Sequence, residues 1–248
     1  YFLMDVKKKL IYEGKAKKIF EHEDKDKVII EFKDDATAFN SLKKAEFIGK
    51  GELNCQISNS IFEYLNKFGI PNHFIHANDK KSIVAKKISI IPLEVVLRNV
   101  AFGSICRQTN IEPGTEFNEP LIDFYLKDDA LNDPLLTKER INLLEIIDMK
   151  ELQNIENITY KINKLLREFF LKMDLNLVDF KLEFGIDQKG KIILADEFSP
   201  DNCRLWDLRT ENVNMRSLDK DRFRNDLGDL IEAYSEISNR IKIFISST

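Results

Sequence analysis

The residues around position 185 predict a β-hairpin with one charged face. The segment VDFKLEFG, residues 178–185, alternates charged and apolar side chains, so Asp179, Lys181 and Glu183 share one face of a strand. The following DQKG, residues 187–190, predicts a four-residue turn, after which the apolar segment IILA returns. The sequence therefore predicts an antiparallel pair of strands with one charged face.

The turn decides which carboxylates meet on that face. In the register that a four-residue turn imposes, Glu183 lies opposite Leu194. Lys181 then lies across from Asp196, and Glu183 is the diagonal neighbour of that aspartate. Two hard oxygen ligands beside a lysine form a platform for Mg²⁺ on which a nucleotide can place its phosphates. A slip of one residue would turn Asp196 to the other face, and an exposed polar face with salt bridges is the alternative interpretation.

Helices and further strands are predicted from the spacing of apolar residues. Apolar residues at helical spacing predict three amphipathic helices, at 51–68, 151–173 and 219–244. Gly69 and Pro71 supply the expected end of the first helix. β-branched segments predict strands at 10–20 (two strands around a glycine turn), 28–32, 73–76, 83–91 and 95–100.

These elements follow one another without regular strand–helix–strand alternation, which favours an α+β fold over a doubly wound sheet. Pro92 interrupts the strand-rich region and predicts a hinge between two lobes. The N-terminal lobe, 1–91, would carry a phosphate-covering loop. The C-terminal lobe, 92–248, would carry the metal and substrate sites.

Composition excludes several classes of protein. The 248 residues include 38 Lys and Arg against 42 Asp and Glu, a net charge of −4, which argues against a dedicated nucleic-acid binder. The apolar runs are too short to span a bilayer, and the first residues contain no apolar core bounded by a cleavage pattern, so we predict no membrane association and a cytoplasmic location. The three cysteines are far apart and odd in number, which favours reduced thiols. We interpret the three residues before Met4 as additions to the native start.

The segment after the hairpin, residues 196–207, is dense in carboxylates, polar groups and arginine. Arg204 could grip a phosphate or carboxylate with its planar fork, while Asp201 orients a hydroxyl or amine of the ligand. An ordinary surface loop with a local Asp–Arg pair is the alternative.

Three other segments carry groups suited to phosphate chemistry. In GKAK, residues 14–17, a glycine and two lysines could close over polyphosphate, although lysine pairs are commonly only solvated. The segment 98–104 supplies Arg98, a turn glycine and Ser104, donors that suit a phosphate monoester. The acidic segment 127–134 could add a metal contact or form a capped turn. The sequence offers no convincing Ser–His–Asp or Cys–His set, which favours chemistry based on positioning, metal and phosphoryl transfer.

Taken in order, these motifs resemble the SAICAR synthetase family, the phosphoribosylaminoimidazole-succinocarboxamide synthases. The resemblance is carried by YEGKAK (12–17), KGELN (50–54), IPLEVVLRN (91–99), VDFKLEFG (178–185) and the segment 196–207, and it extends from about residue 10 to 224. Asn202-Cys203 stands where many members have Gly-Ser, and Asn132 where many have His. Neither departure removes a charged group.

The resemblance implies an ATP-dependent ligase of de novo purine (IMP) biosynthesis. Such an enzyme joins carboxyaminoimidazole ribonucleotide (CAIR) to L-aspartate, forming SAICAR with release of ADP and phosphate through an acyl-phosphate intermediate. It also implies an ATP-grasp-like, two-lobed fold of antiparallel sheets with flanking helices. ATP and Mg²⁺ are the implied cofactors, and a homodimer is the implied assembly.

The resemblance also implies roles for individual residues at the nucleotide end. Gly14, Lys15, Ala16 and Lys17 would cover the ATP phosphates, and the backbone from Lys87 to Ile90 would meet adenine. Glu183 and Asp196 would hold the Mg²⁺ of the nucleotide, and Asp133 a second metal ion near the reacting carboxylate.

At the other end, the implied residues bind CAIR. Its phosphate would meet Arg98, Ser104 and Arg204, and its ribose and imidazole would meet Glu94, Lys181 and Asp201. Lys181, Asp179 and Lys127 are the expected catalytic residues near the reaction centre, and Lys220 and Arg224 would approach the phosphates.

Two other functions fit the same motifs. A small-molecule kinase would use the same lobes and release ADP without aspartate. A noncatalytic nucleotide-binding regulator would bind ATP without turnover, but Lys15, Lys17, Glu183 and Asp196 are all present, which counts against it.

Overall fold

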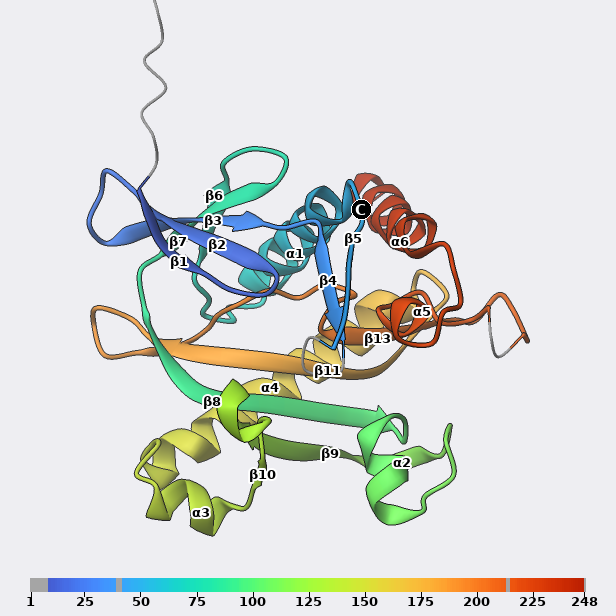
Figure 1. Cartoon of the computed structure of the whole chain (residues 1–248). Coiled ribbons are helices and arrows are strands. Elements are labelled where there is room, and N and C mark those ends of the chain that lie inside the picture. Colours follow the sequence, from blue (N-terminus) through green and yellow to red (C-terminus); the bar gives the residue numbers. More distant parts are fainter. Residues whose placement is uncertain (1–8, 39–41, 213–214, 248) are drawn as a thin grey trace, which may run out of the picture.

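The computed structural model describes residues 9–38, 42–212 and 215–247. The interpretation of the three residues before Met4 lies outside the described residues. Two antiparallel sheets form the centre of the molecule, with helices packed around them (Figure 1). All pairs of named strands are antiparallel, so the predicted α+β class with antiparallel sheets is confirmed.

The first sheet is built from the N-terminal part of the chain. Its five strands lie in the order β1 (Leu10–Glu13), β2 (Lys17–Glu21), β3 (Lys27–Phe32), β7 (Ser82–Lys86) and β6 (Phe74–Ala77). Helix α1 (Lys50–Lys67) contacts β3, β6 and β7. Gly69 is left-handed with φ +69° and Pro71 follows it, so the predicted end of this helix is confirmed.

The second sheet is longer and contains the charged hairpin. Its strands lie in the order β10 (Leu135–Leu136), β9 (Glu116–Leu126), β8 (Ser89–Val100), β11 (Leu175–Ile186) and β12 (Ile192–Leu194), and β13 (Cys203–Asp207) also pairs with β11. Helix α4 (Met149–Leu171) packs against β8 and β11 and confirms the predicted second helix. Strands β9, β10 and β13 are not among the strands predicted from the sequence.

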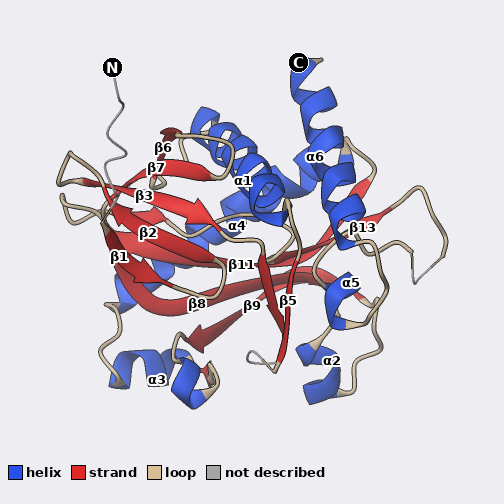
Figure 2. Cartoon of the chain, turned by 45° about the horizontal axis from the view of Figure 1, so that its top comes forward, coloured by secondary structure: helices blue, strands red, loops and turns tan. Residues whose placement is uncertain are grey.

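Smaller elements complete the described chain. They are the hairpin of β4 (Asp35–Ala38) and β5 (Lys43–Glu46), the short helices α2 (Ser104–Thr109) and α3 (Lys138–Leu143), the 3₁₀ turn η1 (Asp129–Leu131), and the C-terminal helices α5 (Asp221–Arg224) and α6 (Leu230–Ser246). Figure 2 shows α1 and α6 together on one side of the strands, and these two helices contact each other.

The alternation along β11 explains how the core is filled. Phe180 and Phe184 on its apolar face are each 1% exposed. Phe180 packs on Phe198, with ring centroids 5.5 Å apart, and Phe198 stacks on Phe170 of α4 at 6.1 Å. The opposite, charged face is thereby left for the site.

The predicted single helix at 219–244 is wrong, because the chain forms α5 and α6 with a break between them. Asp226, Gly228 and Asp229 have positive φ angles of 53°, 75° and 46°. An α-helix cannot continue through left-handed residues, and Asp and Gly have low helix propensity. Apolar residues on either side keep helical spacing across the break, which is why periodicity alone did not detect it.

The predicted strand break at Pro92 is also wrong. Strand β8 is continuous from Ser89 to Val100, and the interruption after β7 falls at Lys87 and Ile88. Glu183 pairs with Glu94 but Gly185 pairs with Ile90, so β8 bulges around Pro92. A bulge tolerates a residue that has no N–H to donate. The division into lobes at 91 and 92 stays a prediction.

The predicted hairpin register is wrong by one residue. Phe184, not Glu183, pairs with Leu194, and the Ala195 N–H donates to the Glu183 carbonyl at 2.9 Å. The connection is one residue longer than predicted, because the Asp187 N–H donates to the Lys191 carbonyl at 2.9 Å. Taken alone, this shift would turn Asp196 away from Glu183.

Two further findings concern the chain as a whole. No helix in the three described ranges is long and apolar enough to cross a membrane. All three cysteines, Cys55, Cys106 and Cys203, are free thiols.

Candidate active site

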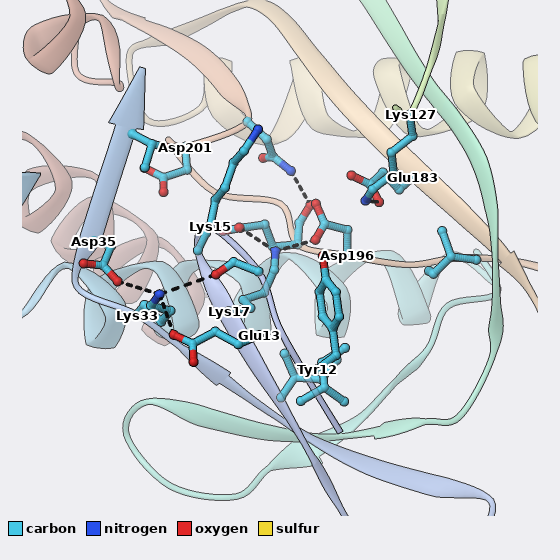
Figure 3. A pocket seen from close by; sticks show the side chains of 18 of the residues that line it. Tyr12, Glu13, Lys15, Lys17, Lys33, Asp35, Lys127, Glu183, Asp196 and Asp201 are labelled. Atoms are coloured by element: carbon cyan, nitrogen blue, oxygen red, sulfur yellow. Dashed lines mark hydrogen bonds and ion pairs between the residues drawn. The ribbon is translucent and has the colours of Figure 1, made fainter. Parts of the chain in front are cut away.

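A cleft of about 1240 Å³ lies between the two sheets. Its walls come from the β1–β2 turn, β3, the β4–β5 hairpin, β8, β11 and the segment after β12 (Figure 3). Charged side chains from distant parts of the sequence therefore face one common space. Its volume suits a ligand of nucleotide size.

The turn between β1 and β2 contributes lysines to one wall. The Gly14 N–H donates to the Lys17 carbonyl at 2.8 Å, which closes the turn. Lys17 hydrogen-bonds to Asp196, and its Nζ lies 2.7 Å from Oε1 of Glu197. Burial opposes the charge on Lys17, but the two carboxylates outweigh it and raise its pKa. Lys15 reaches across the cleft to Asp129, with Nζ 2.6 Å from Oδ1.

The charged face of β11 supplies the opposite wall. Nζ of Lys181 lies 2.5 Å from Oε1 of Glu183 and 2.9 Å from Oε1 of Glu94. Lys127 also hydrogen-bonds to Glu183. Burial opposes the charge on Lys181, but the surrounding carboxylates raise its pKa well above the ordinary value. The carboxylates of this wall thus hold Lys181 in its charged form.

Asp196 reaches this cleft despite the shifted register. Strand β12 ends at Leu194, and Asp196 has a left-handed backbone with φ +58°. This turn points its side chain toward Lys17 and Lys181 instead of continuing the alternation of the strand. Burial would raise the pKa of the Asp196 carboxyl, but the nearby lysines hold it below the ordinary range.

The predicted metal ligands all line this cleft, but they do not lie together in one cluster. The described ranges contain no ready-made cluster of three or more His, Cys, Asp or Glu side chains for a metal ion. However, the Lys181 ammonium lies 2.5 Å from Glu183 and 3.9 Å from Asp196, so a cation already stands between these two carboxylates. Their hard oxygens suit Mg²⁺. Asp133 lines the cleft separately, and its Oδ1 accepts the Asp128 N–H at 2.9 Å.

Asp201 lies at the end of the cleft near α5. Its Oδ2 lies 2.5 Å from Nζ of Lys50, and its Oδ1 accepts a hydrogen bond from Tyr234 at 2.7 Å. Lys220 lines the cleft beside it. Burial lowers the pKa of Lys220, Asp201 raises it, and the neighbouring cations Arg224 and Lys50 lower it further.

A second cluster, the arginine cluster, forms around Asp179. Nη1 of Arg204 lies 2.8 Å from Oδ2 of Asp179, and Nη1 of Arg98 lies 3.6 Å from the same oxygen. Nη2 of Arg98 donates to Ser104 at 3.1 Å. Arg224 joins through Asp221, which also binds Arg204.

A glycine makes this cluster possible. Gly103 has φ +70°, and a Cβ atom there would lie 2.8 Å from Nη2 of Arg204. Any other residue would therefore be strained and would push the guanidinium aside.

The structure sorts the predicted site residues into two groups. One group lines the cleft: Gly14, Lys15, Ala16, Lys17, Lys87, Ile90, Glu94, Lys127, Asp133, Lys181, Glu183, Asp196, Asp201 and Lys220. The other forms the arginine cluster and is not part of the cleft wall: Arg98, Ser104, Asp179, Arg204 and Arg224. The three residues predicted to bind one phosphate, Arg98, Ser104 and Arg204, are thus brought together.

Sequence reasoning missed several participants. Glu197 binds Lys17 and is 4% exposed, although it lies in the segment that had been singled out. Lys50 lies in the KGELN motif, for which the sequence predicts no role, and Tyr234 lies within the range predicted as the helix 219–244. A buried lysine leaves no signal in sequence spacing.

The chain matches known proteins over most of its length. A sequence model of the family described as SAICAR synthetase matches residues 10–241. The chain belongs to the SAICAR synthetase family. The phosphoribosylaminoimidazole-succinocarboxamide synthase of Prochlorococcus marinus subsp. pastoris is 67% identical over 242 residues, covering 98% of this chain and 100% of the relative.

Solved SAICAR synthetases share the fold. One, in complex with ADP, has a TM-score of 0.89 and 48% identity, and the match covers 94% of this chain and 97% of the other. The enzyme from Ehrlichia chaffeensis has a TM-score of 0.91 and 43% identity, covering 94% and 98%. The predicted SAICAR synthetase family, and with it the prediction of an enzyme, is confirmed.

Proposed function

We propose that the cleft joins CAIR to L-aspartate, using ATP, to form SAICAR, ADP and phosphate in purine biosynthesis. The observation that carries this proposal is the meeting, in one cleft, of the β1–β2 lysines and the carboxylates Glu183 and Asp196. The family membership supports the same reaction, and the ADP complex of a relative at 48% identity supports the use of ATP.

The first step activates the carboxylate of CAIR. A carboxylate oxygen attacks the γ-phosphorus of ATP, the bond from that phosphorus to the β–γ bridging oxygen breaks, and ADP leaves with the bond electrons. Lys15 and Lys17 would neutralise the phosphates, and Lys181 the oxygens where charge gathers. The product is an acyl phosphate, whose carbonyl carbon is a much better electrophile than that of a carboxylate.

The second step forms the amide. The neutral amine of L-aspartate attacks the acyl carbon, the carbon–oxygen bond to phosphate breaks with its electrons going to phosphate, and the departing phosphate takes up the proton that the amine nitrogen loses. Lys127 and Asp179 are proposed to act near this centre. The cleft lining supports Lys127 in that role, whereas Asp179 is held by two arginines and would act by fixing them.

Mg²⁺ fits the carboxylate pair of the cleft. Glu183 and Asp196 would hold the ion of the nucleotide, and Asp133 a second one. When bound, Mg²⁺ neutralises the crowded phosphate and carboxylate anions. Lys17 and Lys181, which form ion pairs with these carboxylates in this structure, would then turn toward the phosphates.

The remaining substrate contacts are assigned to the cleft wall and to the arginine cluster. CAIR would extend from the cleft toward the arginine cluster, with its ribose and imidazole near Glu94, Asp201 and Lys181 and its phosphate near Arg98, Ser104 and Arg204. Lys220 and Arg224 would approach the phosphates. The backbone from Lys87 to Ile90, where β7 passes into β8, is proposed to meet adenine, and Lys87 and Ile90 both line the cleft.

The finer expectations on architecture and setting remain part of this proposal. We propose an ATP-grasp-like arrangement, supported by a cleft between two antiparallel sheets, with lobes at 1–91 and 92–248. A homodimer and a cytoplasmic location are proposed as well. Sedimentation velocity would test the first, and fractionation of the source cells the second.

Isotope transfer tests the acyl-phosphate step. CAIR labelled with ¹⁸O in its carboxylate would be turned over with ATP and L-aspartate, and the released phosphate analysed by mass spectrometry. One labelled oxygen transferred to each phosphate supports the mechanism. Unlabelled phosphate with normal SAICAR formation would reject it while leaving the ligase activity established.

A further inference from the structure

A lysine at the start of α1 occupies an unusual position. Lys50 is the first residue of α1, and its side chain is 0% exposed. A cation at a helix N-terminus faces the positive end of the helix dipole, and burial of an ammonium adds a further cost. Its Nζ lies 2.5 Å from Oδ2 of Asp201, so this one carboxylate offsets both costs.

Asp201 is also held from a second side. Tyr234 of α6 is fully buried and donates its hydroxyl to Oδ1 of Asp201 at 2.7 Å. Both carboxylate oxygens therefore have buried partners on the helical side, while Asp201 itself lines the cleft. Burial would raise the pKa of this carboxyl, but Lys50 and Lys220 hold it below the ordinary range.

The backbone fixes where Lys50 lies. The Gly51 N–H donates to Oδ1 of Asp34 at 2.8 Å. A Cβ atom on Gly51 would lie 2.5 Å from the carbonyl oxygen of Phe32, so the first turn of α1 rests directly on the end of β3. The motif KGELN, which sequence analysis left without a role, is thus the device that brings an ammonium behind Asp201.

We propose that Lys50 and Tyr234 are positioning residues, which hold the Asp201 carboxylate at the cleft wall and leave Lys220 available to the imidazole nucleotide. This inference rests on the proposed function, in which Asp201 and Lys220 meet CAIR. Lys220 is the second cation beside Asp201, because both residues line the cleft and the Lys220 N–H donates to the carbonyl of Pro200, the residue before Asp201, at 3.1 Å. Without Lys50, Asp201 takes Lys220 as its partner and withdraws it from the substrate.

Titration calorimetry tests this inference. The dissociation constant of CAIR would be measured in the presence of a saturating nonhydrolysable ATP analogue, and that of the analogue alone, for wild type, Lys50→Met, Lys50→Arg and Tyr234→Phe. We expect the dissociation constant of CAIR to rise about 10-fold or more in Lys50→Met. In Tyr234→Phe it should rise about 3- to 10-fold, which corresponds to the loss of one hydrogen bond. Lys50→Arg should bind CAIR more tightly than Lys50→Met. The dissociation constant of the ATP analogue should stay within about twofold of the wild-type value in all variants.

Arg240→Met supplies a matched control. Arg240 lies on α6 like Tyr234, is 7% exposed and forms a buried ion pair with Asp207, 2.6 Å from Nη2 to Oδ2. It is not part of the cleft wall. This variant should lower Tm without changing the CAIR constant.

The outcomes separate the inference from the proposed function. Unchanged CAIR binding in both Lys50→Met and Tyr234→Phe overturns the inference alone. Failure of the wild type to bind CAIR overturns the proposed function and the inference together. If the affinities for CAIR and for the ATP analogue fall equally, and Arg240→Met shows the same fall, the role of these residues is purely structural and the inference is overturned. If Lys50→Met does not fold, Tyr234→Phe decides, because it removes only a hydroxyl.

Discussion

The lysine-lined cleft and the arginine cluster both pair cations with carboxylates, but they differ in how firmly the pairs are fixed. In the cleft, Lys17 and Lys181 are point charges on flexible stems, and each faces more than one carboxylate. In the cluster, Arg98 and Arg204 present rigid forks to Asp179. We therefore propose that the cleft lysines and carboxylates exchange these partners for phosphates and a metal ion, whereas the arginine cluster keeps its arrangement when substrate binds.

The largest expected effect comes from the exchangeable cleft. Asp196→Asn removes the negative charge that pairs with Lys17 and would hold Mg²⁺, so we expect the turnover rate to fall about 100-fold or more. The measurement is kcat at saturating Mg²⁺. Glu21→Gln, which breaks an exposed pair with Lys9 far from the cleft, serves as the control and should leave kcat unchanged. Near-normal rates in both Asp196→Asn and Glu183→Gln would refute the metal assignment.

The preformed arginine cluster should respond differently. Arg204→Lys keeps the charge but loses the fork that binds Asp179 and Asp221, so we expect KM for CAIR to rise about 10-fold or more, with KM for ATP within about twofold. Steady-state kinetics with each substrate varied in turn measures the split. Arg209→Lys, at an exposed pair with Asp174, is the control. A parallel rise in both KM values would contradict the division between cleft and cluster.

A smaller effect should appear in the pH dependence of stability. Burial, and then the neighbouring Asp221, raise the pKa of Asp219 from its ordinary value of 3.8 to about 7. The folded state therefore binds a proton that the unfolded state has lost, and stability decreases as pH rises through this window. Asp219→Asn removes the dependence, so its Tm relative to wild type should increase from pH 5 to pH 8, measured by differential scanning fluorimetry. A constant difference would show that Asp219 titrates normally.

A still smaller effect on stability is expected for the solvent-exposed ion pair between Lys15 and Asp129. Lys15 and Asp129 have side chains 43% and 71% exposed. Exposed ion pairs contribute only about 0–1 kcal/mol, so Asp129→Asn should change the free energy of unfolding by less than about 1 kcal/mol. Urea denaturation measures this change. A larger loss would mean that the β1–β2 turn is fixed as firmly as the arginine cluster.

Local signals explain which elements could be predicted from the sequence. Helix α1 combines a regular apolar stripe with Gly69 and Pro71 at its end, and all of these signals act within a few residues. The division of the last helix depends on left-handed residues inside a stripe whose spacing is preserved. Pro92 favours a strand break locally, but β8 continues past it because a bulge in the pairing with β11 accommodates the proline.

In the candidate site too, only the side-chain positions that follow from local patterns could be predicted from the sequence. Alternation along β11 placed Lys181 and Glu183 on one face, as observed. Asp196 was predicted to join them through a register that is wrong by one residue. It does so only because its backbone is left-handed. The buried position of Lys50 depends on the contact between α1 and β3, which no local pattern contains.

Parallel measurement of ADP and SAICAR tests the proposed ligase activity, using the purified protein with ATP, Mg²⁺ and CAIR, each time with and without L-aspartate. A ligase should form ADP and SAICAR in equal amounts, and both only when aspartate is present. ADP released at the same rate without aspartate would contradict this activity and indicate a kinase, and ATP binding without any turnover would contradict it and indicate a regulator.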